Sequence, residues 1–327
     1  MTEQHSKKHT CIRMQFAAQR QQGRRHRDIA EDLGISEGQL LAAHVATPEE
    51  TRLHAKPLRS DWPALLGALH RLGPVMALTR NHACVHEVVG CYPEQVSAAG
   101  AACGQEFALQ LDYAVFAQGF AVTESNDQGV QRSLQFFDAQ GQALHKVMLR
   151  PPSNVTAYAA LVAHFATAAV PEFAAAPAAA LAPLLSSARQ SGAQPVAVSG
   201  VQGLLEGAAE QALALRISVA NAGVEQTRSA PVQRIAVMGP WLNVLDPGFN
   251  LHLRQDLVAS AWLLPLAGSV ALQLLDAQGR LLLSVQEAQP HVPDRLPGSR
   301  PWQVLTQELA PSQVQELAPG QVQESLV

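Results

Sequence analysis

The sequence predicts an α+β protein in which one unit, a large antiparallel sheet with accompanying helices, occurs twice. Short runs of apolar and β-branched residues are separated by turn residues, and loops that end in glycine join neighbouring runs. Several sequence segments also recur in the same order at a spacing of about 140 residues. No long helical patterns alternate with these runs, which argues against a parallel βαβ array.

The composition limits the classes of protein to consider. With 327 residues, 47% hydrophobic and 15% charged, the chain can bury a core of about two domains. A net charge of −4 argues against a general nucleic-acid or membrane-surface binder. No stretch of ~20 apolar residues predicts a membrane helix, and residues 1–10 are polar. We therefore expect a soluble, cytoplasmic chain that binds no nucleic acid and does not insert into a membrane.

Residues 1–65 are predicted to be an N-terminal helical segment. Asp28 and Ser36 are each followed three positions later by Glu or Gln, which is the spacing of a capping box, and Thr47-Pro48 indicates a third helix start. The pattern superficially resembles a helix-turn-helix after the basic run 24–27, but the apolar stretch 40–43 requires burial. Helices that cap a larger domain are therefore favoured over DNA binding.

The rest of the chain divides by composition. Residues 66–152 form the first predicted repeat, in which the loop Asp138-Ala-Gln-Gly141 joins two strand-like runs as a hairpin. An Ala/Pro-rich helical connector is expected over 153–212, and a second repeat over 213–306. The polar tail 307–327 contains an eight-residue duplication and is predicted to be disordered.

The internal repeat is the most informative feature of the sequence. The loop Asp138–Gly141 recurs as Asp276-Ala-Gln-Gly279, and Asn81 has its counterpart in Asn221. The segment around Gln110 likewise matches the segment around His252. Matches that keep their order predict two similar sheets related by a pseudo-two-fold axis, with a groove where they meet.

Five motifs together resemble one known family. They are Arg27–Glu37, Leu72–Asn81, Val85-His-Glu87, Ser133–Asp138 and Trp241–Arg254. These motifs are similar to those of the HemS/HmuS/ChuS family of cytoplasmic haemin-transport and haemin-degrading proteins. The resemblance implies two repeated halves with haem held in a cleft between them. It also implies a role in haemin uptake and iron utilisation, as carrier or haemin-degrading factor, with haemin and a haem importer or haem oxygenase as partners.

The chain departs from the family pattern at several positions. The family's axial histidine run corresponds to 177–185, which contains no histidine and has Ala179 near the ligand position. Gln110 replaces a family arginine, the segment 226–230 replaces a Gln-Ile-His-Thr-Gly motif, and 284–288 replaces a basic segment. These changes remove an iron ligand and several cations. The alternative is thus a degenerate, non-catalytic binding module without haem ligation. No conventional enzyme motif is present, so carriage and degradation both remain open.

The resemblance and the repeat give five candidate haem contacts: His252, Arg254, Gln110, His86 and Arg228. For His252, a histidine hydrogen-bonded within the sheet is favoured over a haem contact.

Other histidines are also candidate metal or haem ligands. His82, Cys84 and His86 alternate along one predicted strand, where a solvent-facing surface is favoured over a metal site. His164 is a candidate replacement ligand from the connector, or part of an amphipathic helix surface.

Overall fold

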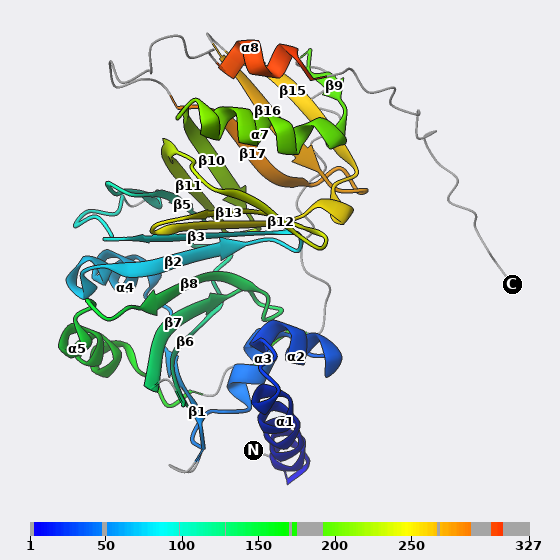
Figure 1. Cartoon of the computed structure of the whole chain (residues 1–327). Helices are drawn as coiled ribbons and strands as arrows, with labels where there is room; N and C mark the ends of the chain where they lie inside the picture. Colours follow the sequence, from blue (N-terminus) through cyan, green and yellow to red (C-terminus); the bar gives the residue numbers. More distant parts are fainter. Residues whose placement is uncertain are drawn as a thin grey trace, which may run out of the picture.

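The computed structural model describes residues 3–47, 51–97, 99–127, 129–169, 172–174, 192–266, 269–288 and 302–309. Two large antiparallel sheets lie one beyond the other, and helices flank each of them (Figure 1). The predicted α+β class with antiparallel sheets is confirmed. No helix of the described residues is both long and apolar enough to cross a membrane.

The first sheet has nine strands and the second sheet has eight. The first sheet contains, in spatial order, β1 (Leu53–Leu58), β6 (Gln118–Asn126), β7 (Gly129–Phe137), β8 (Ala143–Leu149), β2 (Val75–Arg80), β3 (Cys84–Gly90), β14 (Phe249–Arg254), β13 (Trp241–Asp246) and β12 (Ile235–Met238). The second contains β4 (Ala101–Cys103), β5 (Ala108–Leu111), β11 (Val224–Pro231), β10 (Ala214–Ala220), β17 (Leu281–Glu287), β16 (Ser269–Leu275), β15 (Ser260–Leu266) and β9 (Gln194–Val196).

The helices of the described chain fall into two groups that flank the two sheets (Figure 1). They are α1 (Glu3–Gln21), α2 (His26–Asp32), α3 (Glu37–Ala42), α4 (Trp62–Gly67), α5 (Val155–Phe165), α7 (Val201–Glu210) and α8 (Trp302–Gln307). The helices α1 to α3 pack against the end of the first sheet near β1, whereas α7 and α8 lie on the second sheet.

The two sheets exchange strands. In the first sheet, β3 pairs with β14, which comes from the second half of the chain. In the second sheet, the equivalent strand β11 pairs with β5, which comes from the first half. The order of the remaining strands matches between the sheets, so the sequence repeat is a repeat of topology. Each sheet is therefore completed by the other half of the chain.

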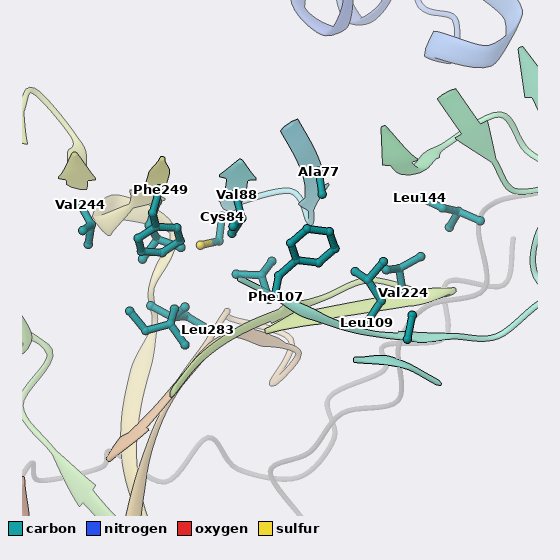
Figure 2. Packing of buried hydrophobic residues seen from close by; sticks show 14 of the residues in the cluster. Ala77, Cys84, Val88, Phe107, Leu109, Leu144, Val224, Val244, Phe249 and Leu283 are labelled. Carbon is teal, nitrogen blue, oxygen red and sulfur yellow. The ribbon is translucent and has the colours of Figure 1, made fainter. Parts of the chain in front are cut away.

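The inner faces of the two sheets form one continuous apolar core. Figure 2 shows Val88 and Phe249 of the first sheet near Leu109 and Leu283 of the second. All four side chains are buried. A second, smaller core lies on the outer face of the first sheet, where Leu40 of α3 and other helix residues cover its β1–β6 end. The rest of this outer face carries polar and charged side chains together with a few apolar ones, among them Leu78, Val85 and Met148.

Asn81 and Asn221 link the two halves reciprocally. The Asn81 side-chain amide donates to the carbonyls of Ala220 and Leu282, at 3.3 and 2.8 Å. The Asn221 amide donates to the carbonyls of Arg80 and Leu144, at 3.0 and 2.7 Å. Each Oδ1 also accepts two N–H groups of its own turn. The two residues that the repeat had matched thus lie on either side of the pseudo-two-fold axis.

The predicted hairpin loops are confirmed in both repeats. Asp138 Oδ1 accepts the N–H groups of Gln140 and Gln142, and Gly141 has φ +80°. Asp276 accepts two N–H groups in the same way, and Gly279 has φ +74°. Positive φ at the last loop position requires glycine because a side chain there is strained.

The N-terminal predictions have mixed outcomes. The capping box at Ser36 is confirmed, because its hydroxyl accepts Gln39 N–H at 3.2 Å and the Gln39 side chain accepts Ser36 N–H. The box at Asp28 is wrong, because α2 begins at His26 and places Asp28 in its first turn. The start at Thr47-Pro48 lies largely outside the described residues. The long polar helix α1 lies within the helical segment predicted over 1–65, although the sequence shows no start signal for it.

Candidate functional site

A pocket of about 440 Å³ lies over the outer face of the first sheet, between its central strands and the turn from α1 to α2. This volume is within the usual range for small-molecule sites, ~300–1,000 Å³. Its lining includes cations, carboxylates, two imidazoles and a few apolar side chains. The charged and imidazole lining residues are Arg20, Arg25, His26, Arg27, Glu37, Arg80, Glu87, Glu124, Lys146 and His252.

Buried carboxylates neutralise part of this positive charge. Glu37, at the first position of α3, pairs with both Arg80 of β2 and Lys146 of β8. Glu124 of β6 pairs with Arg20 at 2.6 Å and lies 3.2 Å from His26. Burial alone would raise the pKa of Glu124, but hydrogen bonds from His26 and Arg20 hold it at about 2. These two carboxylates fix the helices to the sheet.

Two arginines of the pocket keep hydrogen-bonding capacity. The Arg27 guanidinium donates to the carbonyl of His82 at 3.5 Å and makes no ion pair with a described residue. Arg25 is exposed and has neither an ion pair nor a hydrogen bond to the described part of the chain through its side chain. Because guanidinium groups bind carboxylates through paired hydrogen bonds, this end of the pocket suits an anionic ligand.

His252 lines the opposite side of the pocket, on β14. Its Nδ1 lies 2.7 Å from Oδ1 of Asn243, its cross-strand neighbour on β13. Burial lowers the pKa of His252, against the attraction of the Glu87 carboxylate. The imidazole is therefore neutral near pH 7. The interpretation as a histidine hydrogen-bonded within the sheet describes this side chain, and a haem contact stays a prediction.

Two other predicted contacts lie outside this pocket. Arg254 follows His252 on the same strand face, but its guanidinium pairs with Asp256 at 2.6 Å and lies over the Trp241 ring. Gln110 is on the second sheet, where its amide donates to the carbonyl of Ala99 at 2.8 Å. The structure thus separates the repeat-equivalent residues Gln110 and His252 onto different sheets.

His86 and Arg228 lie between the sheets rather than on an outer face. His86 is fully buried, with its ring 5.0 Å from that of Phe249 and its Nδ1 2.9 Å from the Gln226 amide. Burial lowers the pKa of His86 to about 3. Arg228 of β11 lies over the Phe249 ring, with its guanidinium carbon 4.5 Å from the ring centre. Neither side chain reaches the pocket that contains His252.

The surface interpretation of His82, Cys84 and His86 is wrong for two of the three. Cys84 and His86 are buried, because β3 is a central strand whose inner face packs on the second sheet. His82 lies in the turn before the strand and is 3.2 Å from Asp276. Among the described residues no group of three metal-binding side chains occurs.

The remaining sequence candidates are elsewhere. His164 is exposed on α5, where its Nε2 accepts from Arg59 at 2.8 Å, and it does not line the pocket. Ala179 and the whole segment 177–185 lie outside the described residues.

A second cavity of about 410 Å³ marks the junction of the two repeats. Asn81, Asn221 and Arg280 contribute to its walls. It shares Arg27, Glu37 and Arg80 with the pocket over the first sheet. The two cavities are therefore neighbours.

Several pocket residues were missed from the sequence. Arg80 and Lys146 are central, yet each appears in the sequence as a single charge in a strand-like run. The basic run 24–27 is visible in the sequence, but there its charge points to DNA contact rather than to a ligand pocket. Asn243 gave no signal, because its role depends on pairing between β13 and β14.

Comparisons with known proteins agree with the fold. The family model described as the haemin-degrading HemS/ChuX domain matches residues 34–165 and 180–309. The hemin transport protein HemS of Yersinia enterocolitica is 30% identical over 280 residues, covering 74% of this chain and 79% of that protein. HmuS of Yersinia pestis, also a hemin transport protein, is 30% identical over 286 residues, with the same coverage of 74% and 79%.

Solved structures give the same result. Holo-PhuS, a haem-binding protein from Pseudomonas aeruginosa, superposes with a TM-score of 0.79 at 32% identity, covering 94% of this chain and 99% of that one. ChuS, an E. coli haem oxygenase, superposes with a TM-score of 0.73 at 25% identity, covering 87% and 96%. With its two matched domains and these relatives, the chain belongs to the HemS family.

Proposed function

We propose that this protein binds haem in the cytoplasm during haemin uptake and iron utilisation, and that the pocket over the first sheet holds the haem. The family relatives support a haem-related role, since two are named hemin transport proteins and PhuS is named a haem-binding protein. The pocket is the location that we propose for that role on residues of this chain.

The main support for the proposal is that the same pocket is lined by arginines without an ion pair to a described residue and by apolar side chains. Haem presents a flat apolar ring and two propionate carboxylates. Leu78, Val85 and Met148 offer apolar contact from the sheet, and Arg25 and Arg27 offer guanidinium groups at the helix side. His252 comes from the second repeat, whereas the other lining residues come from the N-terminal helical segment and the first repeat. Such a site therefore uses residues of both halves of the chain.

Carriage fits the pocket better than degradation. When bound, the haem iron would supply the redox chemistry, and the protein would have to hold or move protons beside it. The buried polar groups here are already paired, because Arg80 and Lys146 bond Glu37 and His26 bonds Glu124. A haem importer as donor and a haem oxygenase as acceptor are the partners that a carrier requires.

A second candidate is a degenerate HemS-like module that no longer ligates haem. It is favoured by the outer face of the second sheet, where Ser284 and Ala220 replace the pocket's Lys146 and Arg80 and Gln110 occupies the position of His252. If haem bound only on that face in an ancestor, the present chain would have lost it.

Titration of the full chain with haemin distinguishes the two candidates. We expect a shifted, saturable Soret band at about one equivalent. The double variant Arg25→Gln/Arg27→Gln should weaken binding by at least about a hundredfold, since each charge-assisted hydrogen bond contributes ~1.5–3 kcal/mol.

The matched control is Arg216→Gln, which removes an exposed arginine from the outer face of the second sheet. It should leave haemin affinity unchanged. The absence of any saturable band would reject haem binding and favour the degenerate module. An equal loss of affinity in the control would contradict the proposed location of the haem on the first sheet.

A further inference from the structure

A third cavity, of about 600 Å³, is lined by α1, by the start of β1 and by the hairpin of β6 and β7. The ion pair between Arg20 and Glu124 borders both this cavity and the pocket over the first sheet. The remaining lining residues differ for the most part, so the two spaces are adjacent but distinct. The residues that matter below are Arg13, Phe16, His44 and Leu53.

His44 presents a fixed tautomer at this cavity. The residue is 1% exposed, and its Nδ1 lies 2.9 Å from the carbonyl oxygen of Leu40. Because a carbonyl oxygen can only accept, Nδ1 carries the hydrogen and Nε2 of the neutral ring carries a lone pair. Burial lowers the pKa of His44 to about 4, and the nearby His26, Arg13 and His54 act in the same direction. The ring is therefore neutral near pH 7.

The Nε2 atom of His44 makes no hydrogen bond to a described residue. In the described part of the chain, the side-chain atoms that are both sealed from solvent and unbonded belong to His86, Tyr113 and Ser269. The Nε2 atom of His44 is thus not sealed, and it reaches the cavity that His44 lines. A buried acceptor in this position is satisfied by a ligand that brings an O–H or N–H donor.

Arg13 places a guanidinium beside His44. Its Nη1 donates at 2.8 Å to the carbonyl of Ala43, the residue before His44, and its Nη2 donates at 3.0 Å to Oγ1 of Thr10. A guanidinium has more N–H donors than these two bonds use. Arg13 makes no ion pair with a described residue, and therefore it can still bind an anionic group.

The rest of the floor is apolar. Phe16 and Leu53 are both buried, and the ring centre of Phe16 lies 4.9 Å from that of His44 in an edge-to-face arrangement. The carboxylates of the wall already have arginine partners, in the pairs Glu124–Arg20 and Asp127–Arg52. The cavity thus combines an apolar floor, one nitrogen acceptor and one guanidinium without a carboxylate.

We propose that this cavity binds a small aromatic carboxylate that carries a hydroxyl group. The carboxylate pairs with Arg13, the hydroxyl donates to Nε2 of His44, and the ring lies against Phe16 and Leu53. A cavity of about 600 Å³ is within the usual range for small-molecule sites and holds a ligand with a single ring. The site uses no haem and is independent of the proposed haem-binding function.

Isothermal titration of the full chain with the three hydroxybenzoate isomers tests the proposal, with benzoate as the matched ligand that lacks the hydroxyl. We expect at least one isomer to bind with a Kd below about 1 mM. Benzoate should bind at least about fivefold more weakly, because it leaves the histidine nitrogen without a donor.

Two variants assign the roles. His44→Phe keeps a ring of similar size but removes the acceptor. It should lower the affinity for the hydroxybenzoate to that for benzoate, and it should leave the affinity for benzoate nearly unchanged. A merely structural role of His44 would not depend on the hydroxyl of the ligand. Arg13→Gln should weaken both ligands by at least about tenfold, and it serves if the His44 variant does not fold.

The control is Arg216→Gln on the second sheet, which should bind every ligand as the wild type does. If the wild type binds no isomer with a Kd below about 10 mM, the proposal is overturned. Equal losses for hydroxybenzoate and benzoate in His44→Phe overturn the role of His44. An unchanged affinity in Arg13→Gln overturns the placement of the carboxylate.

Discussion

The outer faces of the two sheets have the same topology but different chemistry. Three positions show the contrast: Arg80 against Ala220, Lys146 against Ser284, and His252 against Gln110. The first sheet carries a charged pocket covered by the N-terminal helices, while these positions on the second sheet are uncharged. The duplication has therefore kept the scaffold and allowed one face to diverge. Outer positions can change in this way because they do not contribute to the core between the sheets.

The turns between strands show the opposite behaviour. Asn81 and Asn221 make matching hydrogen bonds across the axis, and the loops that begin at Asp138 and Asp276 have the same turn geometry. These side chains pair with backbone N–H and carbonyl groups of the turns and of the other half, so a change at either copy leaves polar groups unpaired. The two repeats have therefore kept the same side chains at positions where those side chains bond to the backbone.

The largest expected effect concerns the charged face. Glu37→Gln leaves Arg80 and Lys146 buried together without their carboxylate, and we expect a loss of about 3–5 kcal/mol in the free energy of unfolding. Urea denaturation measures it. Ser284→Ala, at the position of Lys146 on the second sheet, should change stability by less than about 0.5 kcal/mol. Similar losses in both variants would remove the contrast between the faces.

The next effect tests the symmetric axis. Asn81→Ala and Asn221→Ala each remove two donors to carbonyls of the other half, so each should cost about 2–3 kcal/mol of unfolding free energy. The two costs should agree within about 1 kcal/mol, because the lost bonds are equivalent. Asn250→Ala, which loses a single bond to Glu87, is the control with a smaller cost. A negligible cost at one asparagine alone would show that the axis is not energetically symmetric.

A smaller expected effect is the pH dependence of stability that comes from His86, whose repeat equivalent is the non-titrating Gln226. Burial holds the folded-state pKa of His86 at about 3, below the ordinary value of 6.5. The unfolded chain therefore takes up a proton first as the pH falls. Stability is complete above about pH 6.5 and declines towards pH 3 by about 1.4 kcal/mol per pH unit for this group.

His86→Gln places glutamine at both equivalent positions and should remove that share of the pH dependence. Buried His145, whose pKa is also lowered to about 3, should keep its own share in the variant. Urea denaturation at pH 7 and pH 5 measures the difference, which should be about 2 kcal/mol smaller in the variant. An identical pH dependence in both proteins would mean that His86 is protonated in the folded state.

Much of the fold could be predicted because turns and helix starts are specified by residues that are close together in the sequence. The loop at Asp138, its copy at Asp276 and the capping box at Ser36 depend on residues within a few positions of one another. The pocket could not be predicted in the same way. Glu37 and Lys146 are distant in the chain, and their pairing depends on how α3 packs on the sheet. The burial of His86 was missed for the same reason.

By itself, the sequence determined the α+β class, the duplication and the family, since repeated short motifs and turn chemistry are local properties of the chain. Only the tertiary structure decided that β14 crosses to the first sheet, which places His252 beside Asn243 and opposite Arg25. The reason is physical: hydrogen-bonded strand pairing and side-chain burial are set by contacts between segments far apart in the chain. The chemistry of the site depends on those contacts.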